Sequence, residues 1–270
     1  MLVQYLVTTC SKSKDDIINI VNSLNVKGSV LVGNQLCDNN NDYYLKTSNS
    51  QIHVFNMKSK GVSINRNELI RQSNAKYIIF LDDDVSYLDS CQECVECILS
   101  QSTQKCIRFN VISSNPDREI PQIKKEGYLK FRQLTSFGVW GQFFDREFLL
   151  KNNIMFREEI GPGTDNNHGE DAIFNHDFLK HSKIYQFKQA MFLADQREST
   201  WHSNRNIEKE TISHGYNYYV LYKSRAKLLA VAFVLTHMWC YPKGTKKREL
   251  IKYMFRGIKK AKKFYNQKTR

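Results

Sequence analysis

Three consecutive carboxylates, Asp82, Asp83 and Asp84, directly follow the apolar run KYIIFL. If the chain stays extended, Asp82 and Asp84 point to one side and Asp83 to the other. Two carboxylates on one side repel each other unless a cation lies near them. Mg²⁺ and Mn²⁺ bind one or two carboxylates together with phosphate oxygens and water, so the triplet indicates a metal-bound diphosphate. The alternative is a solvated acidic turn that caps the next helix.

Glu170 and Asp171 form a second acidic pair, at the start of a helix expected over residues 170–181. They follow a segment rich in Gly, Asp and Asn, residues 157–169, whose composition predicts a mobile loop. A carboxylate on a loop-supported rim is a candidate general base. Acidic residues are also ordinary in the first turn of a helix, where they interact favourably with the helix dipole. The pair alone supports both interpretations.

Two other segments carry residue types that bind metals or sugars. In STWHSN, Trp201 could stack on a sugar face and His202 could complete a metal site, although a surface or core-edge histidine is the simpler interpretation. Cys91, Cys94 and Cys97 have the CxxCxxC spacing of some metal clusters. No fourth cysteine or histidine follows at ligand spacing, so we expect these thiols to lie along one side of a helix as small apolar groups.

Alternating strands and helices must position these groups. Gly-, Asn- and Asp-rich segments separate the first elements, among them a loop at 37–44, and Ser13 with Asp16 has capping-box spacing. Ser86 with Asp89 has the same spacing before the cysteine helix. The expected strands are 2–9, 29–33, 51–56, 76–81, 105–112, 136–144 and 183–188, and the expected helices are 14–25, 63–75, 145–152, 170–181 and most of the chain after 206. This order predicts an α/β fold with a largely parallel, nucleotide-binding sheet that has helices on both faces.

The net charge of +13 over 270 residues is unevenly distributed. Residues 241–270 contain twelve Lys or Arg and one acid, so the first 240 residues carry only +2. A nucleic-acid-binding protein usually spreads basic residues over its folded surface, so we expect no nucleic acid partner. We identify no signal peptide, and the longest apolar run, 228–241, is too short for a membrane span. We therefore expect a cytoplasmic protein with reduced cysteines.

The basic C-terminal segment has the pattern of an amphipathic helix. Leu250, Met254, Ile258 and Ala261 recur at helical spacing, and Lys or Arg fill the other side. Such a helix can lie on an anionic membrane surface. It can equally pack on the rest of the protein with its basic face in solvent. The sequence leaves both alternatives open.

Taken in order, these segments resemble glycosyltransferase family 2, as found in bacterial polysaccharide synthesis. KGVSINRNELIRQSNAKYIIFLDDDV is similar to the family's Gly-x-Ser-x-x-Arg-Asn helix, apolar strand and Asp-x-Asp element. SFGVWGQFFDREFLLKNNIMF resembles the sheet and helix of its sugar pocket, and GEDAIFNHDFLK resembles its Glu-Asp element. The resemblance runs from about residue 3 to residue 204. It implies the GT-A fold, with a catalytic domain over 1–205 and a helical, basic, amphipathic segment over 206–270.

The resemblance also implies roles for single residues. Asp84 would be the main metal ligand, Asp82 would contact ribose or metal, and Asp83 would assist. Asp171 would deprotonate the acceptor hydroxyl, and Glu170 would orient the acceptor or support the base. The remaining candidates are contacts of the nucleotide sugar, namely Thr8, Thr9, Asp38, Arg66 and Trp140, and a tentative metal ligand, His202.

The implied activity is inverting, metal-dependent transfer of a sugar from a nucleoside diphosphate, usually UDP, to an acceptor hydroxyl. Mn²⁺ or Mg²⁺ would be the cofactor, and the 157–169 loop would close over the donor. The acceptor would be a saccharide or a lipid-linked saccharide of cell-surface polysaccharide synthesis, used at the inner face of the plasma membrane. The alternatives are a catalytically inactive sugar- or nucleotide-binding relative and, less in keeping with the carboxylates, a nucleic-acid-binding protein that uses the basic segment.

Overall fold

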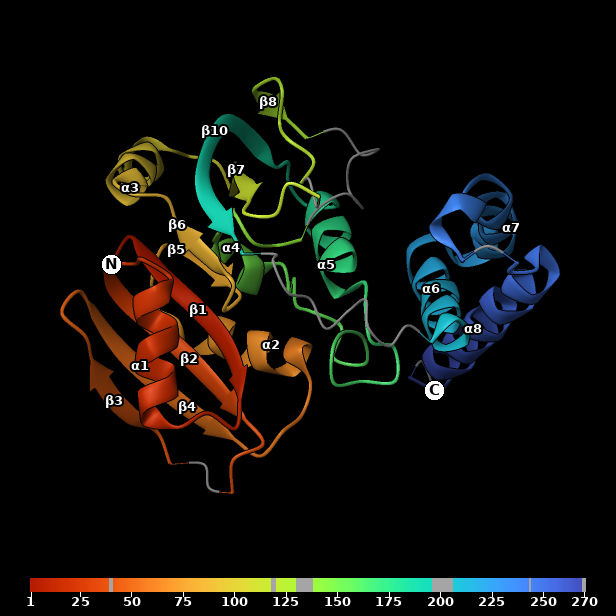
Figure 1. The fold of residues 1–270 in the computed structure, drawn as a ribbon, viewed down its shortest axis with the longest axis horizontal. Coiled ribbons are helices and arrows are strands. Elements are labelled where there is room, and N and C mark those ends of the chain that lie inside the picture. Colours follow the sequence, from red (N-terminus) through yellow and green to blue (C-terminus); the bar gives the residue numbers. More distant parts are fainter. Residues whose placement is uncertain (39–40, 118–119, 130–137, 196–205, 243, 269–270) are drawn as a thin grey trace.

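The computed structural model describes residues 1–38, 41–117, 120–129, 138–195, 206–242 and 244–268. The chain forms an α/β fold that is followed by three further helices (Figure 1). The strands are β1 (Val3–Cys10), β2 (Gly28–Gln35), β3 (Tyr43–Lys46), β4 (Ser50–Met57), β5 (Tyr77–Leu81), β6 (Val85–Tyr87), β7 (Cys106–Ser113), β8 (Gly127–Tyr128), β9 (Gln142–Asp145) and β10 (Tyr185–Ala194). The helices are α1 (Lys14–Ser23), α2 (Val62–Gln72), α3 (Cys91–Gln101), α4 (Arg146–Lys151), α5 (Glu170–Leu179), α6 (Ile207–Tyr222), α7 (Ala226–Thr236) and α8 (Lys247–Lys268), with short 3₁₀ turns η2 (Lys223–Arg225) and η3 (Met238–Cys240).

Four parallel strands form the N-terminal half of the sheet, in the order β4-β2-β1-β5. This is the order expected of a nucleotide-binding α/β half, and it confirms the prediction made from the alternating elements. β3 adds an antiparallel edge to β4. Two of its residues, Tyr43 and Tyr44, fall in the segment that we predicted to be a loop.

The second half of the sheet is mixed rather than parallel. β9 lies between β5 and β7 and is antiparallel to both, while β10 runs parallel to β7. The strand expected over 136–144 is therefore right only at its end. β6 is a further departure, because Val85 and Tyr87 are buried and pair with β10 instead of leading into a capped helix.

The cysteine helix is capped differently from the prediction. The N-cap of α3 is Ser90, without a side-chain hydrogen bond, so the Ser86–Asp89 spacing does not act as a capping box. Cys91 is half-buried, and Cys94 and Cys97 are exposed free thiols along the outer side of α3.

Helices cover both faces of the sheet, as predicted, and they therefore bury β5 on both sides. Ile79 and Leu81 pack in one apolar cluster with α1 and α3. Ile78 and Phe80 pack in another with α2, α4 and α5. All five residues of β5 are buried, which is typical of a central parallel strand.

The three C-terminal helices pack closely on one another beside α5 (Figure 1). A Cβ atom on Gly215 of α6 would lie 2.0 Å from the Met254 carbonyl oxygen, and one on Gly257 of α8 would lie 1.9 Å from the Ile212 carbonyl oxygen. Only glycine permits this approach of the two helices. The described part of the chain contains no helix with the length and apolar character to cross a bilayer.

The predicted apolar stripe of α8 faces inward. Leu250, Met254 and Ile258 are buried with α7, and Ala261 is buried in the cluster that contains Tyr216 of α6. Of the two alternatives left open by the sequence, the packed helix is therefore the one that the structure shows. The expectation that this stripe contacts lipid is wrong for the folded chain.

Candidate active site

The three aspartates lie in a turn at the carboxyl edge of the parallel strands, where open α/β sheets bind ligands. The Val85 amide donates a hydrogen bond to the Asp82 carbonyl (3.1 Å), so the chain reverses directly after β5. The predicted extended geometry, with Asp82 and Asp84 on one side, is therefore wrong. Asp83 and Asp84 line one cavity together, whereas the Asp82 carboxylate turns toward Arg66.

Arg66 on α2 joins the two acidic groups that the sequence singles out. Its Nη1 donates to Asp171 Oδ1 (2.6 Å), and its Nη2 donates to Asp82 Oδ1 (3.1 Å). The guanidinium carbon lies 5.6 Å and 5.2 Å from the ring centres of Phe80 and Phe156. The side chain is only 4% exposed, so this position differs from the expected one beside a nucleotide. The buried Arg66 side chain neutralises two partly exposed carboxylates.

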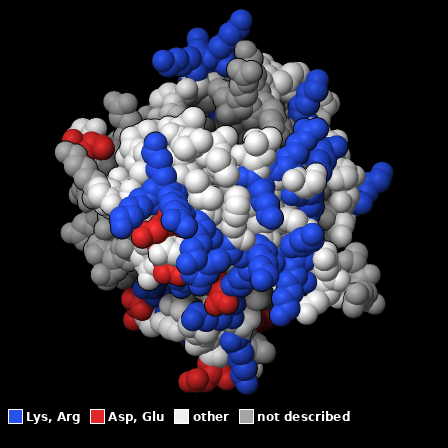
Figure 2. All heavy atoms as spheres, turned by 90° about the vertical axis from the view of Figure 1, so that its right-hand side faces the viewer, with Lys and Arg blue, Asp and Glu red and all other residues white. Residues whose placement is uncertain are grey.

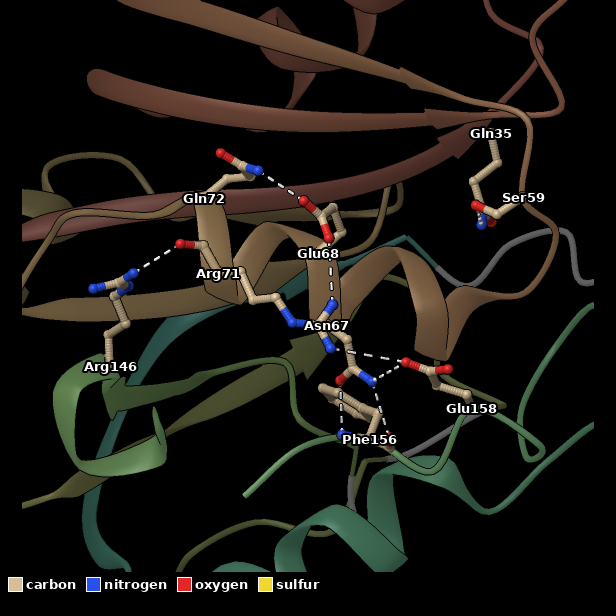
Figure 3. A network of polar contacts seen from close by, with 9 residues as sticks. All are labelled: Gln35, Ser59, Asn67, Glu68, Arg71, Gln72, Arg146, Phe156 and Glu158. Atoms are coloured by element: carbon tan, nitrogen blue, oxygen red, sulfur yellow. Dashed lines mark hydrogen bonds and ion pairs between the residues drawn. The ribbon is translucent and has the colours of Figure 1, made fainter. Parts of the chain in front are cut away.

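Bonds on both sides of Arg66 fix the position of α2. Asn65 Nδ2 donates to the Gly33 carbonyl (2.8 Å), which ties the helix to β2. Asn67 Oδ1 accepts from the Phe156 amide (2.8 Å), and Asn67 Nδ2 donates to the Phe156 carbonyl (3.0 Å) (Figure 3). Arg146 donates to the Ile70 and Arg71 carbonyls at the C-terminal end of α2 and so satisfies two of its unpaired acceptors.

Asp171 is held by a backbone amide as well as by Arg66. The Val139 amide donates to Asp171 Oδ2 (3.1 Å). Trp140 lies beside it, because a Cβ atom on Gly138 would be 2.2 Å from Trp140 Nε1 and 2.8 Å from Asp171 Oδ2. Trp140, expected to contact the nucleotide sugar, is thus next to the carboxylate pair.

The N-terminus of α5, which carries Glu170 and Asp171, is positioned by α6. Asn217 Nδ2 donates to the His168 carbonyl (2.8 Å). Gly169, the N-cap of α5, has φ +96°, and a Cβ atom there would lie 2.1 Å from Asn217 Nδ2. Both the backbone conformation and the close approach require glycine at this position.

Burial shifts the titration of both carboxylates. It raises the pKa of Glu170 to about 7; the neighbouring Asp171 carboxylate adds to this shift, and Arg66 opposes it. Burial also raises the pKa of Asp171, whereas Arg66 and the Val139 amide lower it. A carboxyl group that titrates near neutral pH is suited to proton transfer.

A cavity of about 460 Å³ opens between β1, β2 and α2, a size typical of small-molecule sites. Thr8, Thr9 and Asp83 line it together with two cationic side chains, Lys12 and Lys60. The other lining residues are Cys10, Gln35, Leu36, Gly61, Val62, Asn65, Pro162 and Gly163. Thr8 and Thr9 therefore line a cavity at the end of β1, and their contact with a nucleotide stays a prediction.

Asp38 and Asn65 differ in their relation to this cavity. Asp38 is exposed and is not among the residues that line it, so the structure does not bring Asp38 to the site. Asn65 lines the cavity, and its buried Oδ1 has no hydrogen-bond partner within the described segments. Asn65 Oδ1 is packed against Gly33 of β2.

A second cavity, of about 550 Å³, is acidic. It is lined by Asp83, Asp84 and Asp195 and by no Lys or Arg of the described chain. The Asp195 amide donates to the Asp84 carbonyl (2.7 Å), and Ser114 Oγ donates to Asp195 Oδ1 (3.0 Å). Burial and the neighbouring carboxylates of Asp82 and Asp83 raise the pKa of Asp84 to about 6. The described lining of this cavity therefore concentrates negative charge.

These donors fit Mg²⁺ or Mn²⁺. Both ions prefer oxygen ligands, and they take one or two carboxylates plus phosphate oxygens. Across the described residues no group of three or more His, Cys, Asp or Glu is arranged to hold a metal by itself.

Trp201 and His202 lie outside the residues that the structure describes. Stacking by Trp201 and metal binding by His202 stay predictions.

The loop over residues 157–169, predicted to be mobile, is bonded along its length. The Val62 amide donates to the Pro162 carbonyl (3.0 Å), and Ser63 Oγ donates to the Ile160 carbonyl (2.6 Å). The Tyr265 hydroxyl of α8 donates to the Glu159 carboxylate. Pro162 and Gly163 form a wall of the 460 Å³ cavity, and a lid movement would have to break these contacts.

Several lining residues were not predicted from the sequence, among them Lys12, Lys60, Asn65 and Asp195. Lys12, Lys60 and Asp195 each follow the end of a sheet strand within three residues. Inspecting the first polar residues after every expected strand would have found Lys12 and Lys60, because the carboxyl ends of parallel strands meet at one edge. Asp195 could not be found this way, because the expected strand ended at 188.

The sequence of this chain matches the family model described as glycosyl transferase family 2 over residues 37–157. No curated protein sequence matches the chain. The matched region contains α2, the aspartate turn and β9, but neither Thr8 and Thr9 nor Glu170 and Asp171.

Solved structures similar to this chain include glycosyltransferases. TarS 1-349 of S. aureus in complex with UDP-GlcNAc has a TM-score of 0.60 and 16% identity, with 88% of this chain and 73% of that chain covered. TarS 1-349 without a named ligand has a TM-score of 0.61 and 13% identity, with 99% and 92% covered. GalNAc-T7 with UDP, GalNAc and Mn²⁺ has a TM-score of 0.55 and 12% identity, with 95% and 54% covered. These similarities show the GT-A fold.

Proposed function

From the match to the glycosyl transferase family 2 model over residues 37–157 and from the GT-A fold, we propose that this chain transfers a sugar from a UDP-sugar to an acceptor hydroxyl with inversion and a divalent metal. One observation carries the proposal: donor cavity, acidic cavity and carboxylate pair are contiguous. Asp83 lines both cavities, and Arg66 binds both Asp82 and Asp171. Groups for donor binding, metal binding and proton transfer therefore meet at one edge of the sheet.

In this proposal the 460 Å³ cavity binds the nucleotide. Thr8, Thr9 and Asn65 would contact the nucleoside, and Lys12 and Lys60 would attract the diphosphate. Solved neighbours that contain UDP-GlcNAc, or UDP with Mn²⁺, support a UDP-linked donor and a divalent ion.

The acidic turn would hold the metal. Asp84 and Asp83 would coordinate Mg²⁺ or Mn²⁺, with Asp82 kept in place by Arg66. When bound, the ion would neutralise charge that develops on the departing diphosphate. Asp195, which lines the same cavity, is a further candidate ligand.

Asp171 would accept the proton of the acceptor hydroxyl, and Glu170 would orient the acceptor. A base on the side of the sugar opposite the diphosphate gives inversion at the anomeric carbon. Trp140 beside Asp171 would pack on the sugar face. Arg66 favours the charged form of Asp171, against the effect of burial, and fixes its orientation.

We also propose a catalytic domain over 1–205 and a helical segment over 206–270, with a saccharide or lipid-linked saccharide of cell-surface polysaccharide synthesis as the acceptor. The basic C-terminal helices support a peripheral position at the anionic inner face of the plasma membrane.

A UDP-release assay tests the proposed activity. UDP-GlcNAc, UDP-GalNAc and other nucleotide sugars are compared with Mn²⁺, with Mg²⁺ or with EDTA. We expect metal-dependent release from at least one UDP-sugar, and a loss of at least 100-fold in Asp84→Ala and Asp171→Asn. Binding of UDP by calorimetry without turnover of any donor would instead identify an inactive nucleotide-binding relative. Turnover unaffected by EDTA and by both substitutions would refute the proposal.

A further inference from the structure

An exposed apolar stripe runs along the outer side of α7. Leu228, Ala232 and Leu235 follow one another at spacings of four and three residues, which places them on one side of α7, and Trp239 follows in η3 just beyond the end of the helix. Leu228 is 73% exposed, Leu235 is 53% exposed and Trp239, in η3, is 80% exposed. We call these four residues the α7 face.

The opposite side of α7 is fully used in packing. Ala226, Ala230 and Val234 are buried against the apolar residues of α8. The α7 face is therefore apolar surface left over after the helices have packed. Leu228, Leu235 and Trp239 are among the most exposed large apolar side chains of the described residues, and they lie within one helix and the turn that follows it. Such a concentration is typical of an interaction site, whereas ordinary exposed apolar residues are scattered over the surface.

Basic residues surround this apolar face. Lys223, Arg225 and Lys227 are exposed at its N-terminal end, and Lys246 and Lys247 follow Trp239 in the chain. Residues 206–268 contain fifteen Lys or Arg and three Glu. On the face of the molecule that these helices form, Lys and Arg far outnumber Asp and Glu and border areas of uncharged atoms (Figure 2).

We propose that the α7 face binds the surface of an anionic lipid bilayer, with Leu228, Leu235 and Trp239 in the interface. An apolar stripe bordered by Lys and Arg is complementary to a surface with acyl chains beneath negative headgroups. A second copy of the chain is a poorer partner, because symmetric contact would bring the basic borders together. The 11 residues of α7 are too few to span a bilayer, so the helix lies along its surface.

This surface differs from the one that the sequence indicated. The amphipathic stripe of α8 is buried, and α8 contributes its basic side chains rather than its apolar ones. α6 of the same helical group bonds the chain just before Glu170 and Asp171. If the proposed transfer is correct, attachment through α7 would hold the acceptor side of the site near lipid-linked molecules.

The test uses the full chain and flotation with phosphatidylcholine vesicles, with or without phosphatidylglycerol. We expect binding only to the anionic vesicles. Replacing Leu228, Leu235 and Trp239 by Ser should weaken this binding at least tenfold. The matched control replaces Tyr44 and Tyr128, exposed aromatic residues on other parts of the surface, by Ser and should bind like the parent chain.

Two further measurements separate the alternatives. UDP release in the absence of vesicles should be unchanged in the triple variant, so that failure of membrane binding is distinguishable from failure of the proposed catalysis. Equal binding to neutral and anionic vesicles, or no binding to either, overturns the proposal. A concentration-dependent dimer in size-exclusion chromatography that the triple variant abolishes also overturns it, in favour of a second copy as the partner.

Discussion

At Arg66, one buried guanidinium group bonds two carboxylates that lie 16 and 105 positions away in the chain. The planar group has donors in fixed directions, so it can serve both partners at once. The sequence suggested that Arg66 and the two acidic elements belong to the site. It could not show that they bond to one another, because Asp171 approaches Arg66 only through the packing of α5 on the sheet.

Replacing Arg66 with Met should lower both stability and activity. The change leaves Asp82 and Asp171 without their buried partner, so we expect unfolding in urea to be easier by about 3–5 kcal/mol. UDP release should fall by more than tenfold. Arg71→Met is the matched control on the same helix, where the side chain is half-exposed and a change below about 1 kcal/mol is expected. Equal stabilities of the two variants would contradict this role.

The titration of Glu170 predicts a pH dependence of catalysis. Its pKa is raised to about 7, so the carboxyl is mostly neutral below this pH and charged above it. If the charged pair supports proton removal from the acceptor, kcat/KM should rise as the pH increases through about 7. Glu170→Gln should remove this step in the profile, while Asp171→Asn should abolish activity at every pH. A kcat/KM of the parent chain that does not change between pH 6 and 8 would exclude this role of the Glu170 carboxyl.

The same raised pKa predicts that the free energy of unfolding falls, while activity rises, as the pH increases through about 7. A carboxyl whose folded pKa exceeds its ordinary value of 4.5 stabilises the fold at low pH, and this contribution is lost as the pH rises through about 7. Glu170→Gln should therefore raise the free energy of unfolding at pH 8 by about 1–3 kcal/mol and leave it nearly unchanged at pH 4. Denaturation curves at the two pH values measure this, and destabilisation at pH 8 would contradict it.

At the scale of the elements, α5 depends on α6 for the position of its first turn. Asn217→Ala removes the donor to the His168 carbonyl, so we expect kcat to fall roughly tenfold while the KM for the nucleotide sugar changes little. Ser213→Ala, one turn earlier on α6 and with only a long 3.4 Å contact to Asn167, is the matched control. A change confined to donor KM would show that the contact serves nucleotide binding instead.

The central elements were predictable from sequence, and the short ones were not. Apolar runs and turn residues predicted β1, β2, β4, β5, α1 and α2, because each satisfies its own local pattern. β6 has three residues and is formed by pairing with β10, for example Tyr87 with Phe192. A strand this short has no alternation of apolar and polar residues by which it could be predicted. The chain turns between β5 and β6, so the three aspartates do not have the extended conformation that we expected.

At the scale of the whole molecule, composition showed that positive charge belongs to the C-terminal segment but not which apolar residues remain exposed there. In sequence α8 has one apolar stripe among basic residues, whereas α7 is apolar almost throughout, so α8 was the better candidate for an exposed amphipathic helix. Close packing of α6 on α8 decides between them: it buries Leu250 and Met254 and leaves Leu228 and Leu235 in solvent.

Gly257→Val should loosen this packing. The new side chain would meet the Ile212 carbonyl, so the helices must separate, and we expect a loss of about 1–3 kcal/mol. Thermal unfolding followed by circular dichroism measures the effect. Lys259→Val places the same side chain at an exposed position of the same helix and is the matched control. Val has a higher helix propensity than Gly, so a loss at position 257 reflects the disturbed packing. A melting temperature equal to that of the control would contradict the close approach.

The bond between Arg66 and Asp171 has a consequence for engineered hybrids. A crossover between two related genes after Gly163 and before α5 would take the proposed nucleotide cavity from one parent and the carboxylate pair from the other. Acceptor choice would then be inherited with the second parent and donor choice with the first. Arg66 and Asp171 would come from different parents, so such hybrids should fold only when both parents preserve the geometry of this one contact.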